Sequence, residues 1–243
     1  MIHRTAEGTT FNFSQGRRLA GRYEIVGLLG VGWESEVYLV REITTGVERA
    51  AKVFFPERNL DNRVARKTAG KLHKLRECRA LIQYVAQETI IHNKQSVSVL
   101  ISEYVDGELL SDFIEKQPGR RLHRFEALHL LHAIAVALEP IHNRREYHGD
   151  LHSGNVVVQR IGIEFEIRLI DIFHHQQRKT WSIQDDVINL IRLFYDSIGG
   201  SRFYAREPSV VKEICRGLKH SLITQRFRNA GQLRRHVETC RWE

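Results

Sequence analysis

The sequence predicts an α+β protein with two unequal lobes: a small antiparallel β-sheet lobe carrying one helix, and a larger, mainly helical lobe. Three observations support this prediction. Short β-branched and aromatic runs separated by tight turns occupy the chain up to about Tyr104. A single helical period interrupts them, and helical periods dominate after Gly107. The 243 residues are enough for both lobes to bury a core.

The first lobe is predicted from short β-branched and aromatic runs bounded by tight turns. We expect five strands, at 23–29, 36–40, 49–55, 85–92 and 96–104. The first three are joined by tight turns and form an antiparallel meander. Between the third and fourth strands, apolar residues recur at three- and four-residue steps among basic ones. This period predicts a helix over residues 63–84.

The second lobe is predicted to be built around a long apolar helix at 122–143. We expect two short strands after it, at 156–158 and 167–170, and then helices at 184–197, 209–223 and 232–240. The boundary between the lobes falls near residues 105–107. The expected division is an N-terminal extension at 1–22, a first lobe at 23–105 and a second lobe at 106–243, the two lobes forming one catalytic domain.

The composition restricts the class of protein. Lysine and arginine number 37 against 29 acidic residues, which leaves a net charge of +8 and raises the question of a nucleic acid or acidic lipid partner. The start of the chain lacks the apolar stretch of a signal peptide, and no stretch is long enough to span a bilayer. Three scattered cysteines do not form a disulfide scaffold. We therefore expect a cytoplasmic protein with no membrane span.

A glycine-bearing turn, Gly30-Val31-Gly32, lies between the first two predicted strands. Glycines in such a turn allow backbone amides to approach an anion closely, which makes the turn a candidate phosphate cradle. A dinucleotide-binding fingerprint is excluded, because a strand rather than a helix follows. An ordinary hairpin turn remains the alternative for this motif taken alone.

Lys52 lies on the third predicted strand, flanked by apolar residues. Burying its ammonium is costly unless it meets an anion, so it is a candidate phosphate ligand. An outward-facing lysine on a strand is the alternative. Alternation does not decide between them, because both neighbours are apolar.

The strongest motif is the loop His-Gly-Asp-Leu-His-Ser-Gly-Asn at residues 148–155, between the long helix and a strand. Asp150 and Asn155 can converge in such a loop, where the carboxylate can accept a hydroxyl proton and the amide oxygen can help to hold Mg²⁺. Asp171 ends the strand at 167–170, a typical position for a ligand of a hard divalent ion.

In this order, the glycine turn, the strand lysine, the helix glutamate, the Asp-x-x-x-x-Asn loop and the strand-terminal aspartate resemble the protein-kinase-like superfamily. The resemblance covers roughly residues 23–198. It implies that Gly30 and Gly32 face the phosphates of ATP and that Lys52 contacts the α- and β-phosphates. It also implies that Glu77, the acidic residue of the predicted helix, pairs with Lys52.

The resemblance further implies that the backbone from Glu103 to Val105 binds adenine. Asp150 becomes the catalytic base, assisted by Lys52 and Asn155, while Asn155 and Asp171 hold Mg²⁺. The implied cofactors are therefore ATP and Mg²⁺.

Several positions depart from the family pattern: Ser35 replaces the third loop glycine, Gly149 the arginine before the catalytic aspartate, His152 a lysine, and Asp171-Ile172-Phe173 the Asp-Phe-Gly motif. Only residues 172–185 separate Asp171 from Asp186, which resembles the structural aspartate that braces the catalytic loop. A long phosphorylatable activation loop does not fit there. We therefore expect activity that does not depend on phosphorylation of that loop.

The expected function is transfer of the ATP γ-phosphoryl group to a hydroxyl, most simply by a small serine/threonine kinase of the bacterial type. The His-Gly-Asp-Leu-His-x-x-Asn form is also similar to aminoglycoside phosphotransferases and choline kinases. A small-molecule acceptor and a nucleotide-binding pseudokinase scaffold therefore stay open. We expect ATP rather than nucleic acid as the anionic partner, and basic helix faces suit an acidic protein partner as well. No role is assigned to His174, His175 or Trp33.

Overall fold

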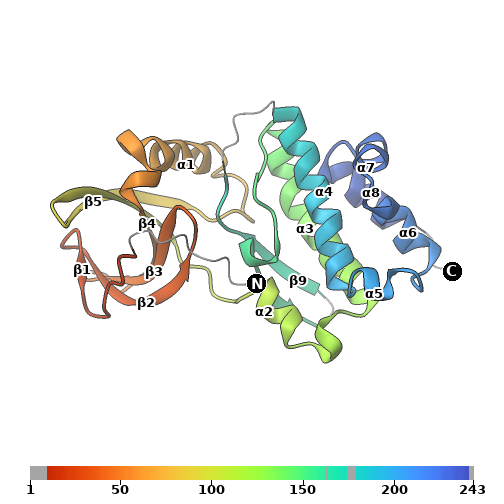
Figure 1. The fold of residues 1–243 in the computed structure, drawn as a ribbon, viewed down its shortest axis with the longest axis horizontal. Helices are drawn as coiled ribbons and strands as arrows, with labels where there is room; N and C mark the ends of the chain where they lie inside the picture. Colours follow the sequence, from red (N-terminus) through yellow and green to blue (C-terminus); the bar gives the residue numbers. More distant parts are fainter. Residues whose placement is uncertain (1–9, 163, 174–178, 241–243) are drawn as a thin grey trace. The chain divides into compact units, whose positions relative to one another are not determined.

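The computed structural model describes residues 10–162, 164–173 and 179–240. The chain forms two compact units. Unit 1 comprises the chain up to Arg76 together with residues 82–104, and unit 2 comprises residues 77–81 together with 105–243. Unit 1 is mainly a sheet and unit 2 is mainly helical (Figure 1), so the predicted α+β class is confirmed.

Unit 1 contains a six-stranded sheet in the order β1-β2-β3-β4-β6-β5, in which all neighbours are antiparallel. Its strands are β1 (Arg18–Leu19), β2 (Tyr23–Val31), β3 (Ser35–Glu42), β4 (Glu48–Phe54), β5 (Tyr84–His92) and β6 (Gln95–Glu103). The five predicted strands are confirmed. Strand β1 was not predicted, because its two residues are too few to show a strand pattern.

The core of unit 1 takes in residues that precede the sheet. Phe11 and Phe13 are buried against the apolar face of the strands. The backbone N–H of Phe11 donates to Oε1 of buried Glu36 at 2.9 Å, and that of Phe13 donates to the Tyr38 hydroxyl at 3.1 Å. The Tyr38 hydroxyl in turn donates to Oε2 of Glu36. The bonds from Phe11 and Tyr38 compensate the burial of Glu36, because a buried carboxylate needs hydrogen-bond donors.

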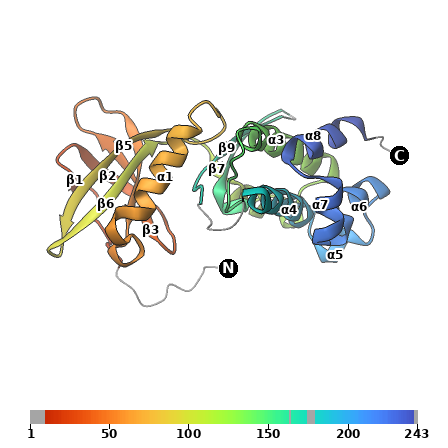
Figure 2. The ribbon, with the colours of Figure 1, turned by 90° about the horizontal axis from the view of Figure 1, so that it is seen from above.

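Helix α1 (Arg63–Lys74) packs against β5 and β6 (Figure 2). The predicted helix over 63–84 is too long, because the chain leaves the helical conformation at Leu75. The backbone N–H of Leu169 donates to the Ala80 carbonyl at 2.7 Å, and Leu81 forms a parallel bridge with Leu169. These contacts within unit 2 take up the segment that a longer helix would need.

Unit 2 is built around the long buried helix α3 (Arg124–Asn143), which packs against α4 (Lys179–Ser197), α8 (Ala230–Thr239) and β9 (Glu164–Leu169). A three-stranded antiparallel sheet joins β9 to β8 (Val156–Ile161) and β7 (Glu108–Leu109). The remaining α-helices are α2 (Leu110–Glu115), α5 (Ser201–Tyr204), α6 (Ser209–Cys215) and α7 (His220–Arg226). The prediction missed α2, α5 and β7.

Two predicted helix boundaries in unit 2 are wrong. Helix α4 begins at Lys179, before the expected start at 184, so Asp186 lies inside it. The helix expected over 209–223 is broken into α6 and α7, because Arg216, Gly217 and Leu218 all have positive φ. Across the described part of the chain, no helix is long and apolar enough to cross a membrane.

Candidate functional site

The glycine turn forms the tip of the β2–β3 hairpin. Gly32 N–H donates to the Ser35 carbonyl at 2.9 Å, and Gly30 pairs with Val37. Neither glycine has a positive φ, so the backbone itself does not require them. A Cβ added at Gly30 would meet nothing within 4 Å. The open space beside Gly30 is compatible with close approach of a ligand to the backbone.

Lys52 lies on β4, opposite Val37 of β3 and Leu100 of β6. Its Nζ forms an ion pair with Oε1 of Glu34 at 2.9 Å, and each side chain is only 13% exposed. Glu34 was not among the predicted site residues, because a carboxylate in a turn gives no signal of its partner. The ammonium of Lys52 is therefore largely shielded from solvent and lies beside the glycine turn.

Glu77 does not lie in the helix that follows β4. It comes after the end of α1 at Lys74 and belongs to unit 2, whereas Lys52 belongs to unit 1. Its predicted place in a helix is therefore wrong. An ion pair between Lys52 and Glu77 stays a prediction.

In unit 2, the structure brings Asp150 and Asn155 together. The Asn155 side-chain amide donates to the Asp150 carbonyl oxygen at 2.8 Å and to its carboxylate Oδ2 at 3.1 Å. A short 3-10 turn, Ser153–Asn155, makes this possible, and its N-cap is His152, whose ring accepts from Gly154 N–H. Asn155 is buried while Asp150 keeps an exposed carboxylate, so the loop presents Asp150 and holds it from behind.

His148 ties this loop to the segment that carries Asp171. Its Nε2 lies 2.8 Å from the Ile170 carbonyl oxygen, and its Nδ1 accepts from the Asp150 N–H at 3.3 Å. These two bonds require a neutral ring with the proton on Nε2. Asp171 follows Ile170 directly and has a φ of 55°, an uncommon conformation for a residue with a Cβ. The loop and Asp171 are thus fixed to one another within unit 2.

The buried carboxylate of Asp186, on α4, accepts hydrogen bonds from the backbone of the loop. Its Oδ2 accepts the His148 N–H at 2.6 Å and its Oδ1 accepts the Gly149 N–H at 2.8 Å. Burial raises the pKa of this carboxyl, but the hydrogen bonds from His142 and Gly149 and the nearby imidazoles outweigh it, so the pKa lies below its ordinary value. Asp186 therefore stays ionised and orders the backbone before Asp150.

Gly149 is required by the geometry of this loop. Its φ is +93°, and a Cβ there would lie 2.9 Å from the Phe173 carbonyl oxygen and 3.0 Å from the Tyr147 ring. An L side chain fits neither the backbone conformation nor the space. The departure from the family pattern at this position therefore has a local structural reason.

A chain of contacts links Asp186 to the C-terminal helix. His142 Nε2 lies 3.1 Å from Asp186 Oδ2, and His142 Nδ1 accepts the Ala230 N–H, at the start of α8, at 3.0 Å. Sequence analysis missed His142, because a histidine within an apolar helix gives no sign of a polar partner.

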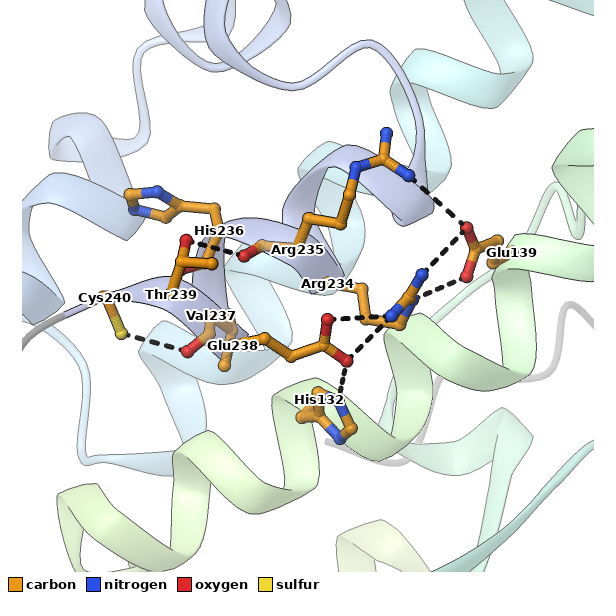
Figure 3. A network of polar contacts seen from close by, with 9 residues as sticks. All are labelled: His132, Glu139, Arg234, Arg235, His236, Val237, Glu238, Thr239 and Cys240. Atoms are coloured by element: carbon orange, nitrogen blue, oxygen red, sulfur yellow. Dashed lines mark hydrogen bonds and ion pairs between the residues drawn. The ribbon is translucent and has the colours of Figure 1, made fainter.

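Helix α8 is fastened to α3 by a set of ion pairs around Arg234 (Figure 3). Arg234 Nε donates to Glu139 Oε2 at 2.6 Å, and its Nη1 donates to both oxygens of Glu238 at 2.8 Å. Glu238 in turn contacts His132 Nε2 at 2.8 Å. These pairs hold the helix whose first N–H reaches His142.

Asp150 and His152 form an exposed polar pair. His152 Nε2 lies 3.7 Å from Asp150 Oδ2, and the two side chains are 56% and 55% exposed. The contact with His152 lowers the pKa of Asp150 below its ordinary value, against the effect of burial. The same contact raises the pKa of His152. Asp150 is therefore ionised at neutral pH.

The predicted donor set for a metal is Asn155 and Asp171. Within the described ranges, no three His, Cys, Asp or Glu side chains cluster to form a metal site. Mg²⁺ commonly uses one or two protein carboxylates and completes its shell with water and substrate phosphates. An amide oxygen and a carboxylate in unit 2 therefore fit a Mg²⁺ ion that arrives with a nucleotide.

The other predicted positions are placed as follows. Glu103 ends β6, where it pairs with Arg49 of β4, and its N–H donates to the Gln83 carbonyl at 3.0 Å. Val105 is the first residue of the second stretch of unit 2. The Trp33 ring is 67% exposed and is covered by the Arg58 guanidinium at 4.1 Å. His174 and His175 lie outside the described residues.

Comparison with known proteins identifies the family. The model of the protein kinase domain matches residues 23–220. The chain belongs to the protein kinase domain family. This family consists of phosphotransferases, so the kinase domain is of the phosphotransferase class. The predicted resemblance is confirmed.

Bacterial serine/threonine-protein kinases are among the relatives of the kinase domain. PrkC of Bacillus subtilis is 27% identical over 150 residues, which make up 60% of this chain and 22% of PrkC. The kinase pkn2 of Myxococcus xanthus is 30% identical over 161 residues, 63% of this chain and 18% of pkn2. The chain spans about a fifth of the length of these relatives.

Solved structures share the fold. The kinase domain of Mycobacterium tuberculosis PknI, in a double mutant, superimposes with a TM-score of 0.66 at 20% identity, covering 93% of this chain and 96% of that one. A second structure of the PknI kinase domain gives a TM-score of 0.63. The predicted architecture, a sheet lobe with one helix and a helical lobe, is therefore confirmed as the kinase fold.

Proposed function

We propose that the kinase domain transfers the γ-phosphoryl group of ATP to a serine or threonine hydroxyl of a protein. The observation that carries the proposal is the loop of unit 2. In that loop an ionised Asp150 is presented at the surface, Asn155 is bonded to it, and Asp186 braces the backbone before it. The matches to bacterial serine/threonine kinases support the choice of acceptor.

Asp150 would orient the acceptor hydroxyl. Its lowered pKa makes it a weak base, but phosphoryl transfer passes through a loose transition state in which positioning matters more than proton abstraction. An ionised carboxylate accepts a hydrogen bond from the hydroxyl, directs the oxygen and takes the proton late in the step.

The remaining groups would neutralise charge. ATP would bind together with Mg²⁺, which would neutralise part of the negative charge on the transferred phosphoryl group. Asn155 and Asp171 would hold that ion, while Lys52 and the backbone of Gly30 and Gly32 would hold the phosphates. The carbonyl of Glu103 and the backbone of Val105 would bind adenine.

The short segment 172–185 would make activity independent of phosphorylation there. It contains Thr180 and Ser182, both within α4, and Ser182 is buried. Thr180→Ala is therefore expected to keep the activity of the kinase domain. Strong stimulation by an upstream kinase acting on this segment would contradict this part of the proposal.

A small-molecule acceptor is the second candidate, favoured by the His-Gly-Asp-Leu-His loop, whose Gly149 is needed by backbone conformation.

An acidic protein acceptor is favoured by unit 1, because basic residues of α1 and its flank are exposed: Arg63, Arg66, Lys67, Lys74 and Arg76. Acidic and basic acceptor peptides of equal length distinguish a charge preference from none.

The test is incubation of the protein with γ-labelled ATP, Mg²⁺ and a generic acceptor protein. Asp150→Asn is expected to lower transfer at least about a thousandfold, because the hydroxyl loses its carboxylate, while ATP binding changes little. Asp112→Asn, an exposed aspartate of the same unit, is the matched control and should behave like the wild type.

The outcomes separate the candidates. Label on serine or threonine that is lost in Asp150→Asn supports the protein kinase. ATP hydrolysis or labelling that needs an added aminoglycoside or choline supports the small-molecule kinase. ATP binding with no transfer to any acceptor indicates a pseudokinase, and wild-type turnover in Asp150→Asn removes Asp150 from the mechanism.

A further inference from the structure

We infer that an apolar hollow in unit 2 is a docking site for an extended peptide that combines apolar side chains with lysine or arginine. The hollow has a volume of about 880 Å³ and is lined by residues of α3, β9 and α8 and by residues 77–80. All of these belong to unit 2. Asp150, Asn155 and Asp171 do not line the hollow, so it is separate from the site proposed for phosphoryl transfer.

Helix α3 contributes one long face to the hollow. Its lining residues recur at steps of three or four, which places them along one side of the helix: Phe125, His129, Ala133, Val136 and Pro140. The side chains of Phe125 and Val136 are 49% and 45% exposed, although both are apolar. This face is roughly 22 Å long at about 1.5 Å per residue. An extended peptide of roughly seven residues would cover it, because a strand rises about 3.3 Å per residue.

The outer edge of β9 offers backbone groups to such a peptide. Strand β9 pairs with β8 on one side, and on the other side the Leu169 N–H donates to the Ala80 carbonyl oxygen at 2.7 Å. Backbone groups alternate between the two sides of a strand, so the N–H groups of Phe165 and Ile167 point to the same side as that of Leu169. Both residues line the hollow. A peptide can therefore add main-chain hydrogen bonds at this edge to its apolar contacts with α3.

The charge around the hollow selects the kind of peptide. Among the described residues that line it, Arg79 is the only lysine or arginine, against four glutamates: Glu77, Glu164, Glu166 and Glu238. Glu238 is already paired with Arg234 and His132 (Figure 3). Glu164 and Glu166 are exposed, and neither forms an ion pair within the described part of the chain. Although the whole chain has a net charge of +8, this surface complements a basic partner.

The experiment begins with a displayed library of random peptides, selected on the intact chain. A non-hydrolysable ATP analogue and Mg²⁺ are present in excess, so that the nucleotide site is occupied. We expect the enriched sequences to carry leucine, valine, isoleucine or phenylalanine interleaved with lysine or arginine. One enriched peptide is then labelled, and its dissociation constant is measured by fluorescence anisotropy.

The apolar contact is tested by Val136→Lys, which should weaken binding at least about tenfold, since it removes an apolar contact and repels a basic peptide. Leu222→Lys is the matched control, because Leu222 is 40% exposed on a helix of the same unit and does not line the hollow. The control should stay within about twofold of the wild type. If Val136→Lys does not fold, Val136→Ser makes the same comparison without a charge.

The charge contribution is tested by combining Glu164→Gln with Glu166→Gln. We expect the affinity to fall about three- to tenfold and its dependence on salt concentration to weaken, because the lost ion pairs are exposed. Glu115→Gln combined with Glu213→Gln is the matched control, since both residues are exposed in unit 2 and do not line the hollow. This control should leave both the affinity and its salt dependence unchanged.

Four results would overturn the inference. These are no enrichment of any peptide, enriched peptides without both apolar and basic residues, and equal affinities of Val136→Lys and Leu222→Lys. The fourth is self-association of the wild type in sedimentation that Val136→Lys abolishes, which would assign the hollow to a second copy of the chain. Binding is measured without turnover, so these outcomes are independent of whether the proposed function holds.

Discussion

The two units hold their candidate catalytic residues in different ways. In unit 2, the backbone before Asp150 is bonded to a fully buried carboxylate, which is itself bonded to a buried histidine. In unit 1, Lys52 is held in part by one ion pair at the edge of a hairpin turn. The loop of unit 2 is therefore tied to fully buried groups, whereas both side chains of the pair in unit 1 stay 13% exposed. Substitutions in the two units should separate stability from activity.

The largest effect is expected from Asp186→Asn. The amide cannot accept from both the His148 and Gly149 N–H groups, and its own N–H₂ faces one of these donors. We expect the free energy of unfolding to fall by about 3 kcal/mol, together with loss of transfer activity. Chemical denaturation measures the change. A stability equal to that of Asp112→Asn would show that the loop is not coupled to the core.

Gly149→Ala should have the next largest effect. The backbone at this position has a positive φ, which a residue with a Cβ disfavours, and the added Cβ would lie 2.9 Å from the Phe173 carbonyl oxygen. We therefore expect a loss of about 2–3 kcal/mol. Gly119→Ala is the matched control, because Gly119 also has a positive φ but nothing within 4 Å of its Cβ position. The control should lose about 1 kcal/mol. Equal losses would mean that only backbone strain matters at Gly149.

The smallest effect concerns the exposed Asp150–His152 pair, the counterpart in unit 2 of the less exposed Lys52–Glu34 pair. Because Asp150 raises the pKa of His152, the pair stabilises the fold fully below the unfolded pKa of about 6.5, and this is lost as the pH rises through the raised pKa. An NMR titration of His152 should show a pKa above the ordinary value.

In Asp150→Asn, the His152 pKa should fall back toward its ordinary value, and the stability change should be barely measurable because both groups are more than half exposed. Asp112→Asn, which leaves this pair intact, is the matched control and should leave the pKa of His152 above its ordinary value. An unchanged His152 pKa would show that the two side chains do not interact in solution.

Much of the fold could be predicted from local pattern. The five predicted strands of unit 1 are short β-branched and aromatic runs bounded by turns, and these local signals identified them. The helix at 63–84 was predicted too long, because no glycine or proline marks its end at Lys74. Contacts of residues 80 and 81 with Leu169 end it, and such contacts are invisible in the sequence.

The candidate site was predictable where its residues are close in the chain. Asp150 and Asn155 are five residues apart in one loop, and the structure joins them by hydrogen bonds. Glu34 and His142 were missed, since each acquires its partner from another element: Lys52 of β4 for the first, Asp186 of α4 for the second. The break between α6 and α7 could have been predicted from Gly217, because a glycine inside a helical pattern can mark a helix end, and here it has a positive φ.

The sequence by itself determined the α+β class, the strand order along the chain and the short-range loop that carries Asp150 and Asn155. Periodicity and short spacing are local properties, so they need no knowledge of partners. Only the tertiary structure decided where α1 ends, that Glu34 meets Lys52 and how Asp186 orders the loop that carries Asp150. Those features depend on contacts between elements distant in the chain, where burial determines which polar groups must be paired.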